Sequence, residues 1–474
     1  MTLIQKELAV IIILLFVGTS IIPSVAQNIS EKSPLILNLG GNHAPIRIIG
    51  NEEFTTENGV TGGIGTENDP YIIENWIIEG DGVIENGIFI TNTTAYFIIC
   101  NCTITDFHHA NKYFSGIKLE YVENGSVSDS TLSKNHLGIN IRYSANIKIT
   151  NCSCYNYPVI YADGIACSYS HHIIISDYEC HRMYNGIDLS QSSDITLRHS
   201  SLHDNTCFGF DSYGYDTETM RIYIENCSIY NNDWGGIRCY DTDFHPSYSV
   251  IKDCEIYMNG RLWQGAGIYI DGLSHNIIVN CTIHDNSEGV ALDTSHNIIR
   301  NCSIYNHIVD DSILNLGINL YGWIFFLEFT TDNTIINCDI FNNEMGIGLF
   351  SNFRLRVEKN NIYNNTHCGI DAFRFYSGIF NYNNFENNGF ADLENYTCCI
   401  SSQQSYIDMR NNWWGSPDGP DLDLAIGFLY AKKLIHIKKT DGEISKYWHS
   451  ILLFRPWLTE PVADAGRHTY KENI

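Results

Sequence analysis

A near-identical stretch of nine residues occurs twice within a short distance of this chain. Residues 275–283 read HNIIVNCTI, and residues 296–304 read HNIIRNCSI, 21 positions later. A marker residue two positions before the isoleucine of NCTI recurs from Asn75 to Asn411, and a Gly followed by an apolar residue interleaves with it. The shortest step from a marker residue to the next Gly is 8 residues, and the commonest step from a Gly to the next marker residue is 14. The repeat unit is therefore about 22 residues long.

The content of each unit predicts strands. Short apolar alternations such as GIYID and GINL are separated by Asn, Ser and Gly, a pattern typical of strands and turns rather than helices. The unit is too short for a propeller blade and lacks the leucine pattern of a leucine-rich repeat. We therefore expect an all-β fold: a single-stranded parallel β-helix, or solenoid, of about 14 coils with capped ends. Side chains of successive coils would form columns spaced about 4.8 Å apart.

The first 26 residues have the pattern of a secretory signal peptide. They contain Lys6, an apolar run from Leu8 to Ile22, and small residues at Ser24 and Ala26. The alternative is an uncleaved membrane anchor, although the run is short for a bilayer. No second apolar stretch of spanning length follows, so we expect a protein that is secreted or at the cell surface, without a membrane span after signal removal.

The rest of the chain divides into four expected parts. Residues 27–70 would form an N-terminal segment and cap, and residues 71–420 the β-helix repeats. Residues 421–460 break the repeat and would form a C-terminal cap. Residues 461–474 begin with PVADAG, which resembles the start of a PKD module, and would be a linker stub.

The charge balance limits the partners that the chain can bind. The net charge is −26, from 54 acidic and 28 basic residues. Such a field repels nucleic acid and anionic membranes, and it favours cations, neutral sugars or basic partners. Glycosylation sequons predict a glycoprotein if the host glycosylates, and they include Asn92, Asn124, Asn364 and Asn395.

The repeats and both flanking segments resemble a known family. The N-C-[TS]-I and G-I-x-h units, with GTENDPYIIENWIIEG (65–80) and NNWWGSPDGP (411–420), resemble the secreted right-handed parallel β-helix repeat proteins. That pectin-lyase-like group includes carbohydrate-binding and sugar-hydrolysing members and the NosD family, which is associated with copper delivery. The resemblance implies a right-handed coil, in agreement with the crossover rule for parallel strands.

Seven of the 16 cysteines occupy the marker column. Strand stacking would hold their Cβ atoms farther apart than a disulfide prefers, so we expect a column of buried free thiols. The alternatives are local disulfides and a ladder that binds a soft metal such as Cu(I). A copper carrier would be expected to show clustered Met and His, but the chain has six Met and no Met-x-x-Met. His275 and His296 are expected to stack on neighbouring coils, with His171 in the same turn column.

Insertions between the markers, rich in Tyr, Trp, Asp and His, are expected to form walls beside a groove. If the residue after each Gly points inward, the residues two and four positions after that Gly point outward and form the groove floor. The catalytic candidates are Asp188, Asp211 and Arg238. The substrate-binding candidates are Tyr213, Tyr240, Trp263, Tyr269, Asp271 and Asp293.

The stacked acids of this floor have three readings. Paired carboxylates about 5 Å apart could serve as acid and nucleophile on a glycoside, or they could hold Ca²⁺ against a uronic acid with Arg238 as base or clamp. The third reading is a solvated face on which Arg238 neutralises Asp211.

We therefore expect a protein that binds a polysaccharide or glycoconjugate, and if it is an enzyme, a polysaccharide lyase or glycoside hydrolase. The alternatives are a structural or adhesive surface rod and a copper-binding protein of the NosD kind. Metal identity is not predicted by the sequence, with Ca²⁺ favoured over copper.

Overall fold

The structure, a computed structural model, describes residues 41–467 except 81–84, 109–113, 157–161, 216–219, 244, 262–264, 308–314, 322–329, 374–375, 390, 397–404, 419–444, 448–449, 454–455 and 457. The chain divides into two compact units, Met1–Asn38 and Leu39–Ile474, and all described residues belong to the second. The expected signal peptide therefore lies outside the described residues.

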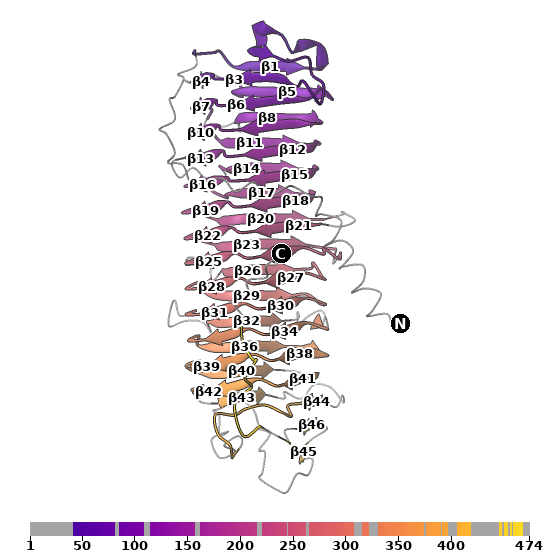
Figure 1. Cartoon of the computed structure of the whole chain (residues 1–474), viewed down its shortest axis with the longest axis vertical. Helices are drawn as coiled ribbons and strands as arrows, with labels where there is room; N and C mark the ends of the chain where they lie inside the picture. The colour runs from indigo at the N-terminus through magenta and orange to yellow at the C-terminus, as the bar shows by residue number, and fades with distance from the viewer. Residues whose placement is uncertain are drawn as a thin grey trace, which may run out of the picture. The chain divides into compact units, whose positions relative to one another are not determined.

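The described residues form a stack of β-coils, and the parallel β-helix is confirmed (Figure 1). Most coils contribute one strand to each of three sheets, in which neighbouring strands are parallel except at the two ends of the third sheet. The first, the floor sheet, has 14 strands and therefore agrees with the expected number of coils. Its strands, in pairing order, are β1 (Ile46–Ile49), β5 (Ile88–Thr93), β8 (Ser115–Val122), β11 (Leu137–Arg142), β14 (Ile165–Ser168), β17 (Ile187–Ser190), β20 (Phe208–Gly214), β23 (Gly235–Asp241), β26 (Ala266–Asp271), β29 (Glu288–Asp293), β32 (Leu316–Tyr321), β36 (Met345–Phe350), β40 (Cys368–Phe373) and β43 (Ala391–Tyr396).

The second sheet, the ladder sheet, has 13 short strands. They are β4 (Ile77–Glu79), β7 (Thr103–Thr105), β10 (Thr131–Ser133), β13 (Ser153–Tyr155), β16 (Glu179–His181), β19 (Ser201–His203), β22 (Ser228–Tyr230), β25 (Glu255–Tyr257), β28 (Thr282–His284), β31 (Ser303–Tyr305), β35 (Asp339–Phe341), β39 (Asn361–Tyr363) and β42 (Asn384–Glu386).

The third sheet runs from β2 to β45, and its first and last pairings, β2 with β3 and β46 with β45, are antiparallel. Its strands are β2 (Val60–Gly62), β3 (Tyr71–Glu74), β6 (Phe97–Cys100), β9 (Gly125–Ser128), β12 (Ala145–Thr150), β15 (His171–Ser176), β18 (Ser193–Arg198), β21 (Ile222–Glu225), β24 (Val250–Lys252), β27 (Ile277–Val279), β30 (Ile298–Arg300), β34 (Thr334–Ile336), β38 (Leu355–Glu358), β41 (Ser377–Asn381), β44 (Ser405–Asp408), β46 (Ser450–Leu453) and β45 (Ser445–Tyr447). Two short strands, β33 (Thr330–Thr331) and β37 (Asn352–Phe353), and two 3₁₀ turns, η1 (Asn51–Glu53) and η2 (Thr56–Asn58), complete the described elements.

The interior is built from columns of identical or similar side chains. In the floor sheet the isoleucines Ile165, Ile187 and Ile237 face inward and are fully buried. At one inner corner Asn205 donates from Nδ2 to Oδ1 of Asn232 (2.8 Å), which donates in the same way to Asn259 (2.9 Å). An amide carries both a donor and an acceptor, so an asparagine repeated on every coil satisfies itself inside the core.

The seven cysteines of the marker column lie in this interior, and their predicted burial is confirmed. They are Cys102, Cys152, Cys227, Cys254, Cys281, Cys302 and Cys338, each at most 2 % exposed. All described cysteines are free thiols, whereas Cys398 and Cys399 lie outside the described residues. Burial raises the pKa of Cys102 to about 11 and that of Cys152 to about 12, so both remain protonated at neutral pH.

The strand register corrects the two outermost markers. Trp76, rather than Asn75, accepts the backbone N–H of Thr103 and lies in the column of Cys102. Asn75 and Asn411 have left-handed φ values of 63° and 60° and occupy the turn position just before the column. Two adjacent isoleucines, Ile77 and Ile78, concealed this difference of one residue at the first marker, and two adjacent asparagines, Asn411 and Asn412, concealed it at the last.

Candidate functional site

The predicted groove floor lies on the outer face of the floor sheet. Register places Asp188 of β17 beside Asp211 of β20, and Asp211 beside Arg238 of β23. Tyr269 of β26 is the next residue in this column. The register confirms the predicted placement of this first column. Burial alternates along β17 and β23, whereas Asp211 on β20 and Asp271 on β26 are themselves buried.

The second predicted column is also confirmed in its placement. Tyr213 pairs with Tyr240, and Asp271 with Asp293, on adjacent strands. The rings of Tyr213 and Tyr240 stack with centroids 5.5 Å apart. Tyr269 links the two columns, because its hydroxyl donates to Asp271 Oδ2 at 3.0 Å.

Arg238 and Asp211 form a bidentate ion pair at the centre of the floor. Arg238 donates from Nε and Nη2 to the two carboxylate oxygens of Asp211, both at 2.7 Å. The Asp211 side chain is 8 % exposed, and the guanidinium also stacks on the ring of Phe208 at 4.2 Å from its centroid. The ion pair is therefore held in a fixed geometry and largely removed from water.

Two further carboxyl groups lie beside this pair with raised pKa values. Burial, with repulsion from Asp211, raises the pKa of Asp188 to about 6. Burial and the nearby Asp188 raise the pKa of Asp163 to about 8, and Asp163 Oδ1 accepts the backbone N–H of Asn185 at 3.1 Å. The floor therefore contains carboxyl groups in different protonation states near neutral pH.

Asp163 and Glu288 were not among the sequence candidates. Asp163 directly precedes Gly164, and Glu288 directly precedes Gly289. Neither residue belongs to the two columns that were counted, which lie two and four residues after each Gly. Burial raises the pKa of Glu288 to about 7, and Asn319 donates to it at 2.7 Å. Alternation counted back from the inward residue after each Gly makes the residue before that Gly an inward position, so this parity passed over both carboxyl groups.

The predicted walls are described only in part. Trp263, a substrate-binding candidate, lies outside the described residues, as do parts of most predicted insertions. The roles assigned to the candidate residues of the floor, catalytic or substrate-binding, stay predictions.

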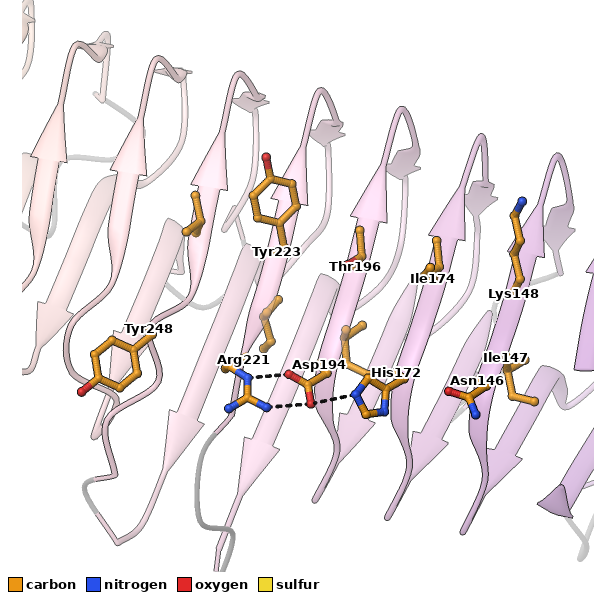
Figure 2. A pocket seen from close by; sticks show the side chains of 13 residues that line it. Asn146, Ile147, Lys148, His172, Ile174, Asp194, Thr196, Arg221, Tyr223 and Tyr248 are labelled. Atoms are coloured by element: carbon orange, nitrogen blue, oxygen red, sulfur yellow. Dashed lines mark hydrogen bonds and ion pairs between the residues drawn. The ribbon is translucent and has the colours of Figure 1, made fainter. Parts of the chain in front are cut away.

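A separate hollow lies on the third sheet (Figure 2). At its centre Arg221 donates to both oxygens of Asp194, at 2.5 and 2.8 Å, and His172 Nε2 lies 3.7 Å from the same carboxylate. Ile174 and Tyr223 line the strand side of the hollow. Sequence reasoning missed this hollow, because its polar residues occupy a turn column in which residue types change at every coil.

The histidine column is corrected in one residue. The rings of His275 and His296 stack at 4.6 Å, as expected. The third histidine of this turn position is His172, with φ of 56°, and not His171, which pairs with Ser193 inside a strand. The residue pair HisHis made the two indistinguishable by spacing.

One group of described side chains has the composition of a metal site. Ligand atoms of Asp241, Asp243 and His245, after β23, lie within 4.8 Å of one another. Asp241 accepts the backbone N–H of Asp243 at 2.8 Å and lies 3.2 Å from His245 Nδ1. These hydrogen bonds account for the arrangement without an ion.

Among the described residues, no helical segment combines the length and apolarity needed to cross a bilayer.

Several solved structures have a similar chain path, and their names describe enzymes that act on polysaccharides. The mannuronan C-5 epimerase AlgE6 A-module of Azotobacter vinelandii is 12% identical (TM-score 0.41), covering 78% of this chain and 90% of that one. A double mutant of the periplasmic alginate epimerase AlgG is 11% identical (TM-score 0.46; 73% and 85%). The catalytic domain of a GH87 α-1,3-glucanase bound to tetrasaccharides is 14% identical (TM-score 0.47; 66% and 63%). At these values the similarities carry no conclusion about activity.

Sequence comparison identifies the family of this chain. No curated protein matches the chain, but one family model does. The family model described as right handed beta helix region matches residues 86–246, 215–323 and 245–414, which together cover more than half of the chain. These matches coincide with the coils from β5 to β44 and support the right-handed coil that the resemblance implied. The chain belongs to the right-handed β-helix family.

Proposed function

We propose that this protein is a secreted or cell-surface carbohydrate-binding protein whose glycan lies on the floor sheet between β17 and β29. One observation carries the proposal: outward carboxylates, a guanidinium and tyrosines occupy adjacent positions on consecutive strands of a rigid sheet. Recognition sites combine aromatic surface with a few fixed polar groups, and this floor has both.

The chemistry of the floor suits a hydroxyl-rich ligand. Ionised carboxylates accept hydrogen bonds from sugar hydroxyls, whereas a protonated Asp188 or Asp163 donates one. The partly buried rings of Tyr213 and Tyr240 offer apolar surface next to these groups. A structural rod without a ligand would gain nothing from carboxyl groups held in a dry environment, because buried acids cost stability.

The test is a binding titration against a panel of neutral, amino-substituted and uronic polysaccharides, with and without Ca²⁺. Replacing both Asp211 and Arg238 by Ala should abolish binding while the melting temperature changes little, because no unpaired charge remains. The matched control replaces Asp332 and Arg354, a bidentate pair on another face. Equal binding by both double variants would contradict the proposal.

A processing role has one observation in its favour, the pKa of about 6 at Asp188. A carboxyl group with such a pKa can donate a proton to a glycosidic oxygen. Arg238 holds both oxygens of Asp211, so Asp211 would stabilise charge rather than attack. The same panel should be read for new reducing ends and for the ultraviolet absorbance of unsaturated uronides. Products that persist in the Asp188→Asn variant would contradict this role.

A further inference from the structure

The C-terminal segment Pro461–Arg467 lies across successive coils on the ladder sheet. Its residues contact β42, then β39, then β31 and β28, so the segment runs back toward earlier coils. The described part of this predicted linker stub makes specific contacts with the β-helix.

Side chains of the ladder sheet bind the backbone of this segment. Asn384 accepts the N–H of Val462 at 2.7 Å and donates to its carbonyl at 3.1 Å. Asn361 donates to the carbonyl of Ala465 at 3.2 Å. Gly466, with φ of 89°, has its N–H on the carbonyl of Lys359, and a Cβ there would collide with Asn361. The sheet thus forms a track that accepts an extended peptide.

The track ends in a receptor for the guanidinium of Arg467. Arg467 Nη1 donates to Thr282 Oγ1 at 2.7 Å and to Ser303 Oγ at 3.3 Å, two hydroxyls on adjacent strands. Nη2 donates to the carbonyl of Asn280 at 3.0 Å, two residues before Thr282. The receptor therefore consists of two neighbouring hydroxyls and one turn carbonyl.

The same three groups recur farther along the track. Ser201 and Ser228 pair on adjacent strands β19 and β22, and the carbonyl of His199 lies two residues before Ser201. All three residues line a second hollow on this sheet. The hollow lies three strands from the Arg467 receptor, a separation of about 14 Å at the usual strand spacing.

The surroundings of the hollow favour a cation. Glu179 and Glu255 are the register neighbours of Ser201 and Ser228 on either side, and their side chains are 59 % and 55 % exposed. Asp177 also lines the hollow, and its lining contains no lysine or arginine. Carboxylates bracket the Arg467 receptor in the same way, because Glu255 is the register neighbour of Thr282 and Asp339 that of Ser303.

One wall of the hollow is rigid. Tyr230 and Tyr257, which line it, belong to a stack of rings along the ladder sheet with centroid separations of 4.6–5.4 Å. The stack comprises Tyr155, His181, His203, Tyr230, Tyr257, His284, Tyr305, Phe341 and Tyr363. Each ring face is covered by its neighbour, so the wall presents ring edges and hydroxyls to a ligand rather than stacking surfaces.

We propose that the hollow at Ser201 and Ser228 binds an arginine side chain of an extended peptide segment from a partner protein. The partner's backbone would reach the hollow from the side of the earlier coils, because residues 461–467 of this chain already cover the sheet from β42 to β28. This site lies on a different sheet from the proposed glycan floor and does not depend on it.

The probe is the capped tripeptide acetyl-Ala-Gly-Arg-amide, which copies residues 465–467, titrated calorimetrically into the full chain. We expect saturable binding at one site, and binding of the Lys analogue weaker by about tenfold, because an ammonium group cannot reproduce the fixed fork of a guanidinium. Absence of saturable binding, or equal affinity for both peptides, would overturn the proposal.

Matched variants locate the site. Ser201→Ala with Ser228→Ala should weaken peptide binding about tenfold, by loss of two hydrogen bonds to a charged group. Thr282→Ala with Ser303→Ala removes the equivalent hydroxyls under Arg467 and should leave the affinity unchanged. Equal losses in both double variants would contradict the assignment.

A third variant tests the equivalence of the two receptors. The ligand for this variant is acetyl-Arg-amide, because residues 461–466 still cover the track beside the first receptor. Arg467→Ala vacates that receptor, so the stoichiometry should rise from one ligand to two, and a value that stays at one contradicts the equivalence. Sedimentation velocity tests whether the hollow binds a second copy of this chain. Dimers that the peptide disperses would assign the hollow to a second copy of this chain and overturn the assignment to a partner.

Discussion

Two aspartate–arginine pairs on different faces of this β-helix share a geometry and differ in exposure. Arg238 on the floor sheet and Arg221 in the hollow of Figure 2 each bind both oxygens of an aspartate one coil away. The aspartate and arginine side chains are 8 % and 34 % exposed on the floor, but 22 % and 55 % exposed in the hollow. An ion pair in water contributes little, whereas a buried one makes each partner depend on the other. Burial, rather than hydrogen-bond geometry, separates the two sites.

The largest expected difference comes from removing one arginine at a time. Arg238→Ala leaves the buried carboxylate of Asp211 without its partner and should lower the free energy of unfolding by about 3 kcal/mol. Arg221→Ala should lower it by less than about 1 kcal/mol, because water replaces the guanidinium. Urea denaturation of both variants measures the difference. Equal losses would show that burial does not distinguish the pairs.

A smaller effect should appear in the pH dependence of stability. The pKa of Asp163 is raised to about 8, so the folded protein holds a proton that the unfolded chain releases near pH 4. Stability from this group is complete below about pH 4 and is lost as the pH rises toward 8. Asp163→Asn should flatten the melting temperature between about pH 7 and 8, the part of this range above the raised pKa values of Asp188 and Glu288. A slope that persists in the variant would assign the effect to other groups.

The hollow should show the smallest effect, with the opposite sign. Bidentate hydrogen bonds from Arg221 lower the pKa of Asp194 below its usual value. The stability from this pair is therefore present above about pH 4 and is lost as the pH falls through the lowered pKa. Asp194→Asn should lower the melting temperature above about pH 4, by a degree or two at most, and should change nothing in strong acid, where Asp194 is itself protonated. A larger loss at pH 7 would mean that the exposed pair contributes more than its surroundings suggest.

Most of the fold could be predicted from the sequence because a solenoid converts repetition into position. Once the unit length is known, parity alone decides that Asp188 and Arg238 point outward and that Ile187 and Ile237 point inward. Positions were uncertain where the repeat does not determine which of two adjacent residues occupies a column. Asn75 was misplaced by one residue because the marker was counted from Ile77 instead of its neighbour Ile78. Asn411 was taken for Asn412, and His171 for His172, because identical neighbours cannot be told apart by spacing.

The candidate site was predictable as a surface but not as an environment. Sequence parity placed Asp211 beside Arg238, but the raised pKa of Asp163 depends on how deeply a short turn buries it. The docking of Arg467 joins residues 185 positions apart through contacts that no repeat encodes. Local periodicity therefore predicts columns, whereas burial and long-range docking require the folded chain.

Each coil from Cys227 to Cys338 carries one buried thiol of the marker column, and the first of these coils also carries Cys239. The native chain can therefore report its own local opening. An alkylating reagent reaches such a sulfur only when its coil opens. Coils of a solenoid are held chiefly by their neighbours, so opening near an end should be more frequent than opening in the middle. Mass-spectrometric alkylation rates at five consecutive coils would then trace a profile of local opening along the molecule, without any introduced label.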